Sequence, residues 1–180
     1  MNVTVFGSSS PKEGEQEYEE ARHLGELLAK AGHSILTGGY MGTMEAVSRG
    51  AADAGGHTIG VTCEQIETWR QAKANQWVRE ERRFPTLQER LYSLIETCDA
   101  ALALPGGVGT LAEIAVMWSQ MQTHSMHAVP LILIGDGWQK TFQGLFSGHD
   151  RHIAKAHREL LTFAPDIEAG FNTLQKALPA

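Results

Sequence analysis

The sequence has few cysteines, no surplus of basic residues and no long apolar run, and each shortage excludes a class of protein. Two cysteines in 180 residues, Cys63 and Cys98, are too few for a disulfide framework, which favours a reducing cytoplasm. The 15 Lys and Arg residues are outnumbered by 21 Asp and Glu, which argues against nucleic-acid binding. Because no apolar stretch approaches the ~20 residues that span a bilayer, we expect no membrane association.

Two common signatures of nucleotide binding are also missing. A dinucleotide site needs G-x-G-x-x-G after the first strand, whereas the turn Gly7–Pro11 contains a single glycine. A Walker loop needs a lysine after its last glycine, but Gly109 is followed by Thr110 and Leu111. Two pairs of histidines are spaced three residues apart without a third ligand, which is typical of polar surface rather than of a metal site. We therefore expect neither a metal nor a nicotinamide or flavin cofactor.

Short β-rich apolar runs alternate along the chain with amphipathic helical stretches. This alternation predicts an α/β fold in which a parallel sheet is covered by helices on both faces, as three α/β/α layers in a single domain, 1–180. The expected strands are Val3–Phe6, Ser34–Thr37, His57–Thr62, Ala100–Leu104, Pro130–Ile134 and Leu160–Phe163. The expected helices cover about 15–31, 42–55, 64–75, 86–98, 110–123, 138–147 and 166–178.

The segment Cys63–Pro85 is the least regular part of the chain. Its charged run, Arg79–Arg83, predicts a solvated helix face, because charge-dense stretches are usually exposed. The segment also follows the third expected strand, and open α/β sheets bind ligands beyond the carboxyl ends of their strands. It is therefore also a candidate cover for a ligand site.

Turns rich in glycine or serine follow the first, second and fourth expected strands. Each turn alone is weak support for a site, since glycines often serve only tight turns and close packing. All three would meet at the carboxyl edge of a parallel sheet, which packing alone explains less well. The predicted ligand-binding residues are Gly7 and Ser8, then Gly38, Gly39, Gly42 and Thr43, then Pro105, Gly106, Gly107, Val108, Gly109 and Thr110.

The third turn, Pro105–Thr110, joins a buried strand to a helix and is followed by a carboxylate, Glu113. Backbone N–H groups at a helix start lack intrahelical partners, and the helix dipole adds positive charge there, so the turn suits a phosphate. Thr110 and Glu113 also match the capping box T-x-x-E, in which the glutamate bonds back to the helix cap. Helix capping and catalysis both remain open for Glu113 on this pattern.

Arg90 lies at the flank of the expected helix 86–98, beside the apolar stripe formed by Leu87, Leu91, Leu94 and Ile95. A flanking arginine commonly packs its stem and exposes its charged head. The alternative is that Arg90 turns toward the ligand edge, where a guanidinium holds a carboxylate or phosphate. A further helix face with Met117, Trp118 and Met121 fits either partner contact or core packing.

These motifs resemble the LOG (Lonely Guy) family. The resemblance runs from Val5–Ser9 through Gly38–Val47 and Pro105–Glu113 to Pro130–Leu133, about three-quarters of the chain. It implies a Rossmann-like, doubly wound nucleotide-binding domain, usually assembled as a homodimer or a larger oligomer. It also implies a phosphoribohydrolase that releases the free base from a nucleoside 5′-monophosphate such as a cytokinin riboside monophosphate.

The resemblance places the catalytic glutamate and arginine of the family on Glu113 and Arg90. The lysine that commonly follows the arginine is replaced by Leu91. In the first hypothesis, Glu113 stabilises or attacks the electron-poor anomeric carbon during N-glycosidic hydrolysis, and Arg90 orients Glu113 and keeps it ionised. In the alternative, the same turns hold a nucleotide or phosphorylated cofactor in a non-catalytic carrier. No lysine lies in the three turns, so no Schiff-base cofactor is predicted.

Overall fold

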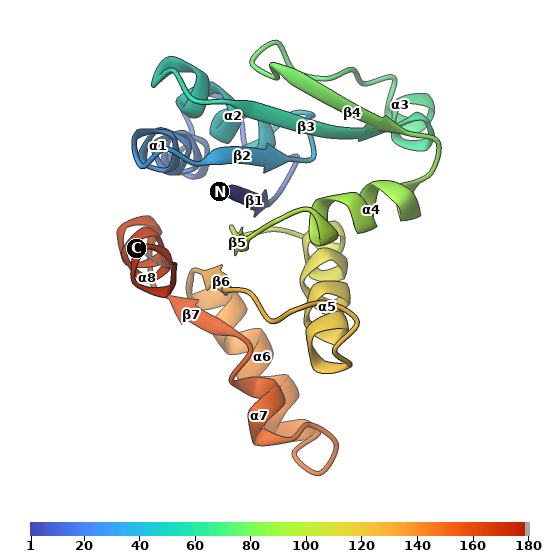
Figure 1. Cartoon of the computed structure of the whole chain (residues 1–180), viewed down its shortest axis with the longest axis vertical. Coiled ribbons are helices and arrows are strands. Elements are labelled where there is room, and N and C mark those ends of the chain that lie inside the picture. The colour runs from blue at the N-terminus through green and yellow to red at the C-terminus, as the bar shows by residue number, and fades with distance from the viewer. Residues whose placement is uncertain (179–180) are drawn as a thin grey trace.

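Seven short segments pair side by side into one sheet in which every neighbouring pair of strands is parallel. The strands are β1 (Asn2–Phe6), β2 (Ser34–Thr37), β3 (Thr58–Cys63), β4 (Glu80–Phe84), β5 (Ala100–Ala103), β6 (Leu131–Ile134) and β7 (Thr162–Ala164). The computed structural model describes residues 1–178. Figure 1 shows the sheet with helices on both of its faces, which confirms the predicted Rossmann-like α/β fold.

The segments between the strands form the helices. These are α1 (Gln16–Lys30), α2 (Thr43–Asp53), α3 (Glu64–Arg70), α4 (Leu87–Glu96), α5 (Val108–Gln122), α6 (Asp136–Gly148), α7 (Lys155–Arg158) and α8 (Ile167–Ala177). α1, α2 and α8 cover one face of the sheet, and α4, α5 and α6 cover the other (Figure 1). Within residues 1–178 no helix has the length and apolar content needed to cross a bilayer.

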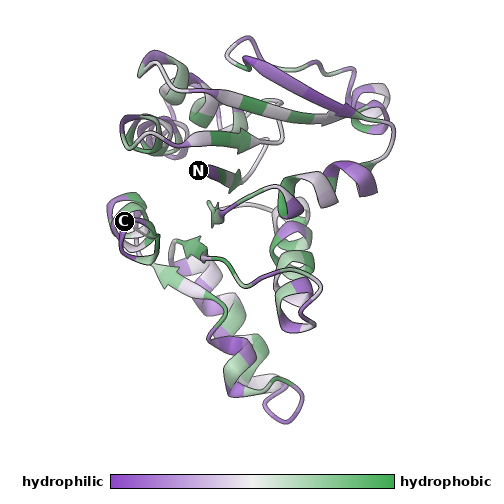
Figure 2. Cartoon of the chain, in the orientation of Figure 1, coloured by the Kyte–Doolittle hydropathy of each residue, from purple (hydrophilic) through white to green (hydrophobic). Residues whose placement is uncertain are grey.

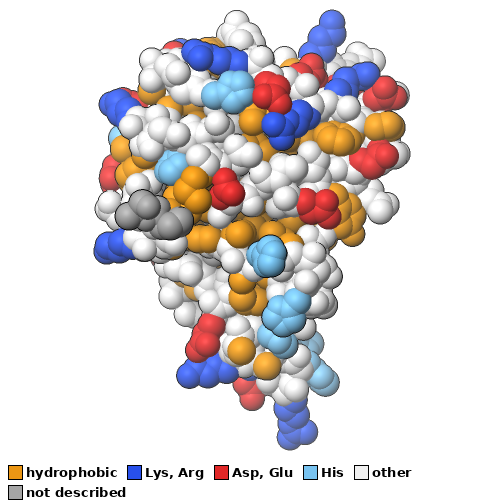
Figure 3. Space-filling model, viewed as in Figure 1, with side chains coloured by type: hydrophobic (Ala, Val, Ile, Leu, Met, Phe, Trp, Pro, Cys, Tyr) orange, Lys and Arg blue, Asp and Glu red, His pale blue; other side chains and the backbone are white. Residues whose placement is uncertain are grey.

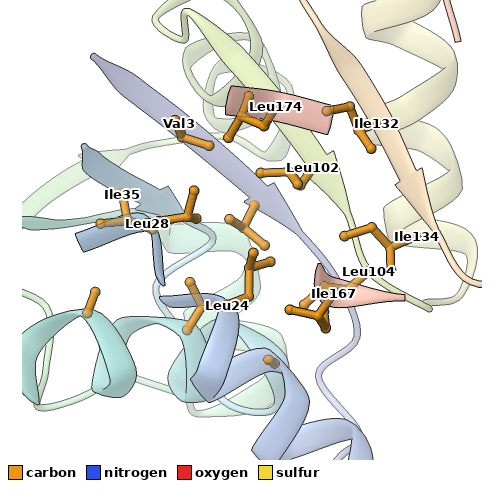
Figure 4. Close-up of a cluster of buried hydrophobic side chains, with 14 of the residues drawn as sticks. Val3, Leu24, Leu28, Ile35, Leu102, Leu104, Ile132, Ile134, Ile167 and Leu174 are labelled. Atoms are coloured by element: carbon orange, nitrogen blue, oxygen red, sulfur yellow. The ribbon is translucent and has the colours of Figure 1, made fainter. Parts of the chain in front are cut away.

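Side chains from the strands enter two apolar layers, one on each face of the sheet. In the layer drawn in Figure 4, Val3 and Leu102 from neighbouring strands pack with Leu24 of α1. In the other layer, Phe6 belongs to the same cluster as Phe142 of α6. Because both faces are covered, the central strands are nearly continuous apolar runs, as is typical of parallel sheets.

Several side chains whose location the sequence left open belong to the core. Met117, Trp118 and Met121 are buried in the layer formed by α4, α5 and α6, so core packing is the correct interpretation of this face. Cys63 and Cys98 are both buried free thiols. Burial raises the pKa of the Cys98 thiol to about 11.

The strand order, β4-β3-β2-β1-β5-β6-β7, determines where a ligand can bind. The chain builds outward from β1 to β4, then crosses back to the other side of β1 to add β5, β6 and β7. Such a reversal opens a crevice beyond the carboxyl ends of the two strands on either side of it, and open α/β sheets bind ligands there. Since Phe6 pairs with Ala103, the turns after β1 and β5 lie side by side.

The charged run in the irregular segment forms an edge strand, so the predicted solvated helix face is wrong. β4 pairs only with β3, and Figure 2 shows β4 as predominantly hydrophilic. Thr62 of β3 donates a hydrogen bond of 2.6 Å to the Glu81 carboxylate, and Arg83 pairs with Glu67 at 2.7 Å. Charged side chains on an edge strand discourage pairing with the strands of other chains. The charged residues of β4 therefore protect the open edge of the sheet.

The helix after β5 begins two residues earlier than predicted. Its N-cap is Gly107, so Thr110 lies inside the first turn and not at the cap. The capping-box interpretation of Glu113 is therefore wrong. A complete capping box occurs instead at α4, where the Thr86 hydroxyl accepts from the Glu89 N–H at 3.2 Å and the Glu89 carboxylate accepts from the Thr86 N–H at 3.1 Å.

Candidate active site

A cleft of about 630 Å³ opens at the carboxyl edge of the sheet, over the crevice between β1 and β5. Its volume lies within the range of pockets that bind small molecules. Its walls come from the turns after β1 and β2, from the start of α2, from α3, from α4 and from the first turns of α5. Figure 1 shows α3, α4 and α5 together on the right side of the view.

Arg90 lies inside the protein, so an exposed arginine head at the flank of α4 is the wrong interpretation. Its side chain is only 7% exposed. Nε donates a hydrogen bond of 2.7 Å to the carbonyl oxygen of Val61, and Nη2 donates one of 3.3 Å to that of Gly38. The guanidinium carbon also lies 5.6 Å from the centre of the Tyr40 ring. These contacts fix the guanidinium and leave Nη1 without a hydrogen bond to residues 1–178.

The glycine turn after β2 supports this arginine and the neighbouring turn. A Cβ at Gly38 would overlap Nη2 of Arg90, so only glycine lets the guanidinium approach the backbone. Farther along, the N–H and the hydroxyl of Thr43 both donate to the carbonyl oxygen of Ser8, at 2.9 and 3.0 Å. The turn after β2 therefore holds both the turn after β1 and the side chain of Arg90 in place.

Glu113 faces Arg90 across the cleft. Its side chain is 12% exposed, and its Oε1 lies 3.8 Å from Nη1 of Arg90, beyond hydrogen-bond distance. Burial raises the pKa of Glu113 to about 7, although the charge of Arg90 acts in the opposite direction. A carboxyl group with such a pKa, next to a fixed cation in a cleft, is typical of a functional site.

The first turn of α5 presents backbone donors to the same cleft. Its cap, Gly107, makes no side-chain hydrogen bond, and no acidic residue lies in the first turn. The N–H of Leu111 bonds to the Gly107 carbonyl at 3.0 Å, but those of Val108, Gly109 and Thr110 bond to no atom of residues 1–178. A Cβ at Gly107 or Gly109 would meet nothing within 4 Å, so these positions stay open toward a ligand. Free N–H groups and the helix dipole favour an anion here.

The structure divides the residues predicted to bind ligand into two groups. One group lines the cleft and comprises Gly7, Ser8, Arg90, Gly107, Val108, Gly109, Thr110 and Glu113. The other does not line it and comprises Gly38, Gly39, Gly42, Thr43, Pro105 and Gly106. In this second group, Gly106 packs so closely on Thr110 that a Cβ would overlap its hydroxyl. Direct contact between a ligand and either group stays a prediction.

Sequence reasoning missed much of the wall opposite α5. Trp69 and Arg70 of α3 line the cleft, and so does Leu87, which is 48% exposed although it was predicted in the buried stripe. The other missed lining residues are Ser9, Ser10, Tyr40, Met44, Gln65 and Ile66. The sequence contained one indication of this wall, which was its position: the segment after the third expected strand was a candidate cover for a ligand site. α3 occupies this position.

The part of the chain that the structure describes contains no group of three or more His, Cys, Asp or Glu side chains that could hold a metal ion. The rings of His149 and His152, for example, have their centres 6.5 Å apart. On the face drawn in Figure 3, several histidine side chains lie over the lower part of the molecule, where Figure 1 places α6 and α7. Neither helix lines the cleft.

A family model described as the SLOG cluster4 family matches residues 1–143. This stretch contains every residue that lines the cleft. Among solved structures, the chain is similar to the molybdenum cofactor binding protein from the phototrophic bacterium Rippkaea orientalis, with a TM-score of 0.75 over 97% of this chain and 95% of that chain. At 24% identity, this likeness bears on the fold alone.

Two curated relatives extend the match along the sequence. The chain is 32% identical to a probable cytokinin riboside 5′-monophosphate phosphoribohydrolase of Oryza sativa subsp. japonica, over 98% of this chain and 78% of the relative. It is 30% identical to the cytokinin riboside 5′-monophosphate phosphoribohydrolase of Rhodococcoides fascians, over 75% of this chain and 68% of the relative. Both matches agree with the resemblance carried by the glycine motifs. The chain therefore belongs to the LOG-like SLOG cluster4 family.

Proposed function

We propose that the chain hydrolyses the N-glycosidic bond of a nucleoside 5′-monophosphate and releases the free base and ribose 5-phosphate. The observation that carries the proposal is a buried carboxylate, Glu113, in the same cleft as a helix start whose N–H groups are free. The names of the two phosphoribohydrolase relatives support this reaction class. A cytoplasmic setting, favoured by two buried free thiols, belongs to the proposal.

The phosphate binds at the start of α5 in this proposal. Glu113 lies five residues after Val108, about 7.5 Å farther along the helix axis. Its side chain leans back toward the helix start, as side chains of α-helices do. The carboxylate and the free N–H groups are therefore separated by about the span of a ribose 5-phosphate, with the phosphate at one end and the anomeric carbon at the other.

The chemistry follows from the charge that develops on the sugar. When the bond between C1′ and the base nitrogen breaks, positive charge builds on C1′ and the ring oxygen, and an ionised Glu113 stabilises it. Water then adds its oxygen to C1′, and the departing base gains a proton. Arg90 is held by two backbone carbonyls, so it acts as a fixed positive charge that favours the ionised form of Glu113.

The test is an assay for free base and ribose 5-phosphate after incubation with AMP or a cytokinin riboside monophosphate. We expect turnover by the unaltered chain and a loss of about 10²–10³-fold in kcat for Glu113→Gln. Glu96→Gln is a matched control, because Glu96 is exposed on α4 and does not line the cleft. If the unaltered chain releases no ribose 5-phosphate from either nucleotide, the proposal fails for these substrates.

The product assay, combined with a binding measurement, also identifies a non-catalytic carrier. A carrier would bind nucleotide with similar affinity before and after Glu113→Gln, and neither protein would turn it over. The position after the arginine holds Leu91, which packs against the core and offers no charge to a ligand. Calorimetry with AMP, run beside the product assay, distinguishes the two functions.

A further inference from the structure

A second arginine, Arg70, spans part of the cleft from the side formed by α3. It is the last residue of α3, and its Nη1 donates a hydrogen bond of 2.9 Å to the hydroxyl of Ser9. Ser9 lies in the turn after β1, 61 residues away in the sequence, and both residues line the cleft. The contact therefore joins the β3 side of the cleft to the turn beside the start of α5.

No carboxylate among the described residues neutralises the charge of Arg70. Its guanidinium forms no ion pair with any carboxylate of residues 1–178, whereas Arg83 on the adjacent edge strand pairs with Glu64 and Glu67. Its other contact is the ring of Trp69, whose centre lies 4.7 Å from the guanidinium carbon. A serine hydroxyl accepts a hydrogen bond but carries no charge, so this cation remains free to bind an anion.

The cleft is positive in an acidic protein. Its charged lining residues are Arg70, Arg90 and Glu113, which give two positive charges and one negative charge. Arg90 faces Glu113, so the uncompensated charge lies at Arg70. The chain as a whole carries a net charge of −6. A site of this kind attracts an anionic ligand in spite of the overall charge.

We propose that Arg70 is a specificity-determining residue that selects phosphorylated ligands. On binding, its guanidinium exchanges the Ser9 hydroxyl for phosphate oxygens, because a phosphate carries the opposite charge and can accept two parallel N–H bonds, whereas the hydroxyl is neutral and accepts one. The phosphate is then held between Arg70 and the free N–H groups at the start of α5. The inference rests on the proposed function only in taking a nucleoside 5′-monophosphate as the ligand.

Calorimetry with AMP and adenosine tests this role in the Glu113→Gln background, where the ligand is not consumed. We expect Arg70→Ala to weaken AMP binding by about 10–100-fold and to leave adenosine binding unchanged, with Arg70→Lys in between. Ser9→Ala removes only the resting partner of Arg70, so AMP affinity should stay within about 3-fold. Arg151→Ala is a matched control, since Arg151 is exposed and lies outside the cleft.

Three outcomes would overturn the inference. Equal losses of AMP affinity in Arg70→Ala and Ser9→Ala would mean that Arg70 only braces the turn. Equal losses of affinity for AMP and adenosine in Arg70→Ala would mean that Arg70 maintains the shape of the cleft and does not bind the phosphate. A chain that binds AMP no better than adenosine before any change at Arg70 would have no phosphate selectivity to explain.

Failure of the proposed function gives a different result. A chain that binds AMP more tightly than adenosine but releases no ribose 5-phosphate refutes the hydrolase and leaves the role of Arg70 intact. Thermal stabilisation by inorganic phosphate supplies a second measure in a chain with Glu113 unchanged. Arg70→Ala should reduce this stabilisation, and Arg151→Ala should not.

Discussion

At the scale of single residues, the burial of one carboxylate controls the chemistry of the cleft. Glu113 is 12% exposed, and its closest cation, Nη1 of Arg90, is 3.8 Å away. Arg90 is tied to the carbonyl oxygens of Val61 and Gly38, so it cannot move closer without breaking these hydrogen bonds. The desolvation of the carboxylate is therefore compensated only in part, and its pKa stays near 7.

The first prediction concerns stability. The pKa of Glu113 is about 7 in the folded protein, above an ordinary value of 4.5, so the folded state binds more protons than the unfolded state between these pH values. The stability that the protonated carboxyl contributes is full below pH 4.5 and is lost as the pH rises through 7. Glu113→Gln should raise the free energy of unfolding at pH 8 by up to about 3 kcal/mol.

Urea denaturation at several pH values measures this difference. The increase in the free energy of unfolding caused by Glu113→Gln should shrink toward zero as the pH approaches 4.5, because the glutamate in the folded protein is then neutral, as the glutamine is. Glu96→Gln should show no such trend, because Glu96 is exposed. A gain that is the same at all pH values would contradict the raised pKa.

The second prediction concerns activity. Ionised Glu113 is the active form in the proposed reaction, so kcat/KM should fall about tenfold for each pH unit below a midpoint near 7. Arg90→Gln removes the opposing positive charge, so this midpoint should move to higher pH, whereas Arg90→Lys should move it less. A profile without an acid limb between pH 5 and 8 would argue against a catalytic carboxylate, on the basis of its pKa of about 7.

At the scale of elements, two kinds of glycine serve the site. Gly38 and Gly106 are close-packed, the first against Arg90 and the second against Thr110. A Cβ added at Gly107 or Gly109 would meet no atom within 4 Å. Both glycines lie at the start of α5, beside its free N–H groups. The first kind preserves the structure, and the second keeps backbone donors accessible to a ligand.

The third prediction separates these two kinds. Gly109→Ala should keep the fold, and it should stabilise α5 by about 0.5 kcal/mol because alanine favours helix. It should nevertheless raise the KM for AMP at least tenfold, because the new methyl group enters the phosphate site. Gly38→Ala should instead cost about 2–3 kcal/mol of stability, since Arg90 must move. Thermal melts and initial rates measure both effects, and equal loss of stability in both variants would contradict the distinction.

At the scale of the whole molecule, the order of the strands creates the site. β1 and β5 are neighbours in the sheet but are separated by three other strands in the chain. Glycine turns, α3 and α4 from distant parts of the sequence therefore meet at one edge. This topology also places α4 and α5 next to each other, with exposed apolar side chains on both helices.

The fourth prediction concerns assembly, which stays an expectation from the family resemblance. Tyr92 of α4 is 37% exposed and Leu111 of α5 is 39% exposed, and a second copy of the chain would bury such residues in a homodimer. Leu111→Glu should then give a monomer in light scattering after size exclusion. Leu145→Glu is a matched control on α6, where Leu145 is 36% exposed. A monomeric unaltered chain would rule out the dimer.

Local pattern was sufficient for most of the fold. The buried strands are short apolar runs and the longer helices are amphipathic, so their positions follow from the local sequence pattern. β4 was not predictable, because its charged residues are stable in a strand only through pairing with β3 at a sheet edge. The start of α5 was misplaced because the T-x-x-E pattern suggested a cap at Thr110, whereas the chain becomes helical directly after Gly107.

The sequence by itself determined the α/β class and the three turns, because periodicity and motif spacing are properties of the chain, and its family resemblance singled out Glu113 and Arg90. Only the tertiary structure decided that Arg90 is buried, that the glycines of the turn after β2 support the site without lining the cleft, and that Arg70 contacts Ser9. Burial and contact depend on which elements lie side by side, and the crossover between β4 and β5 sets this arrangement.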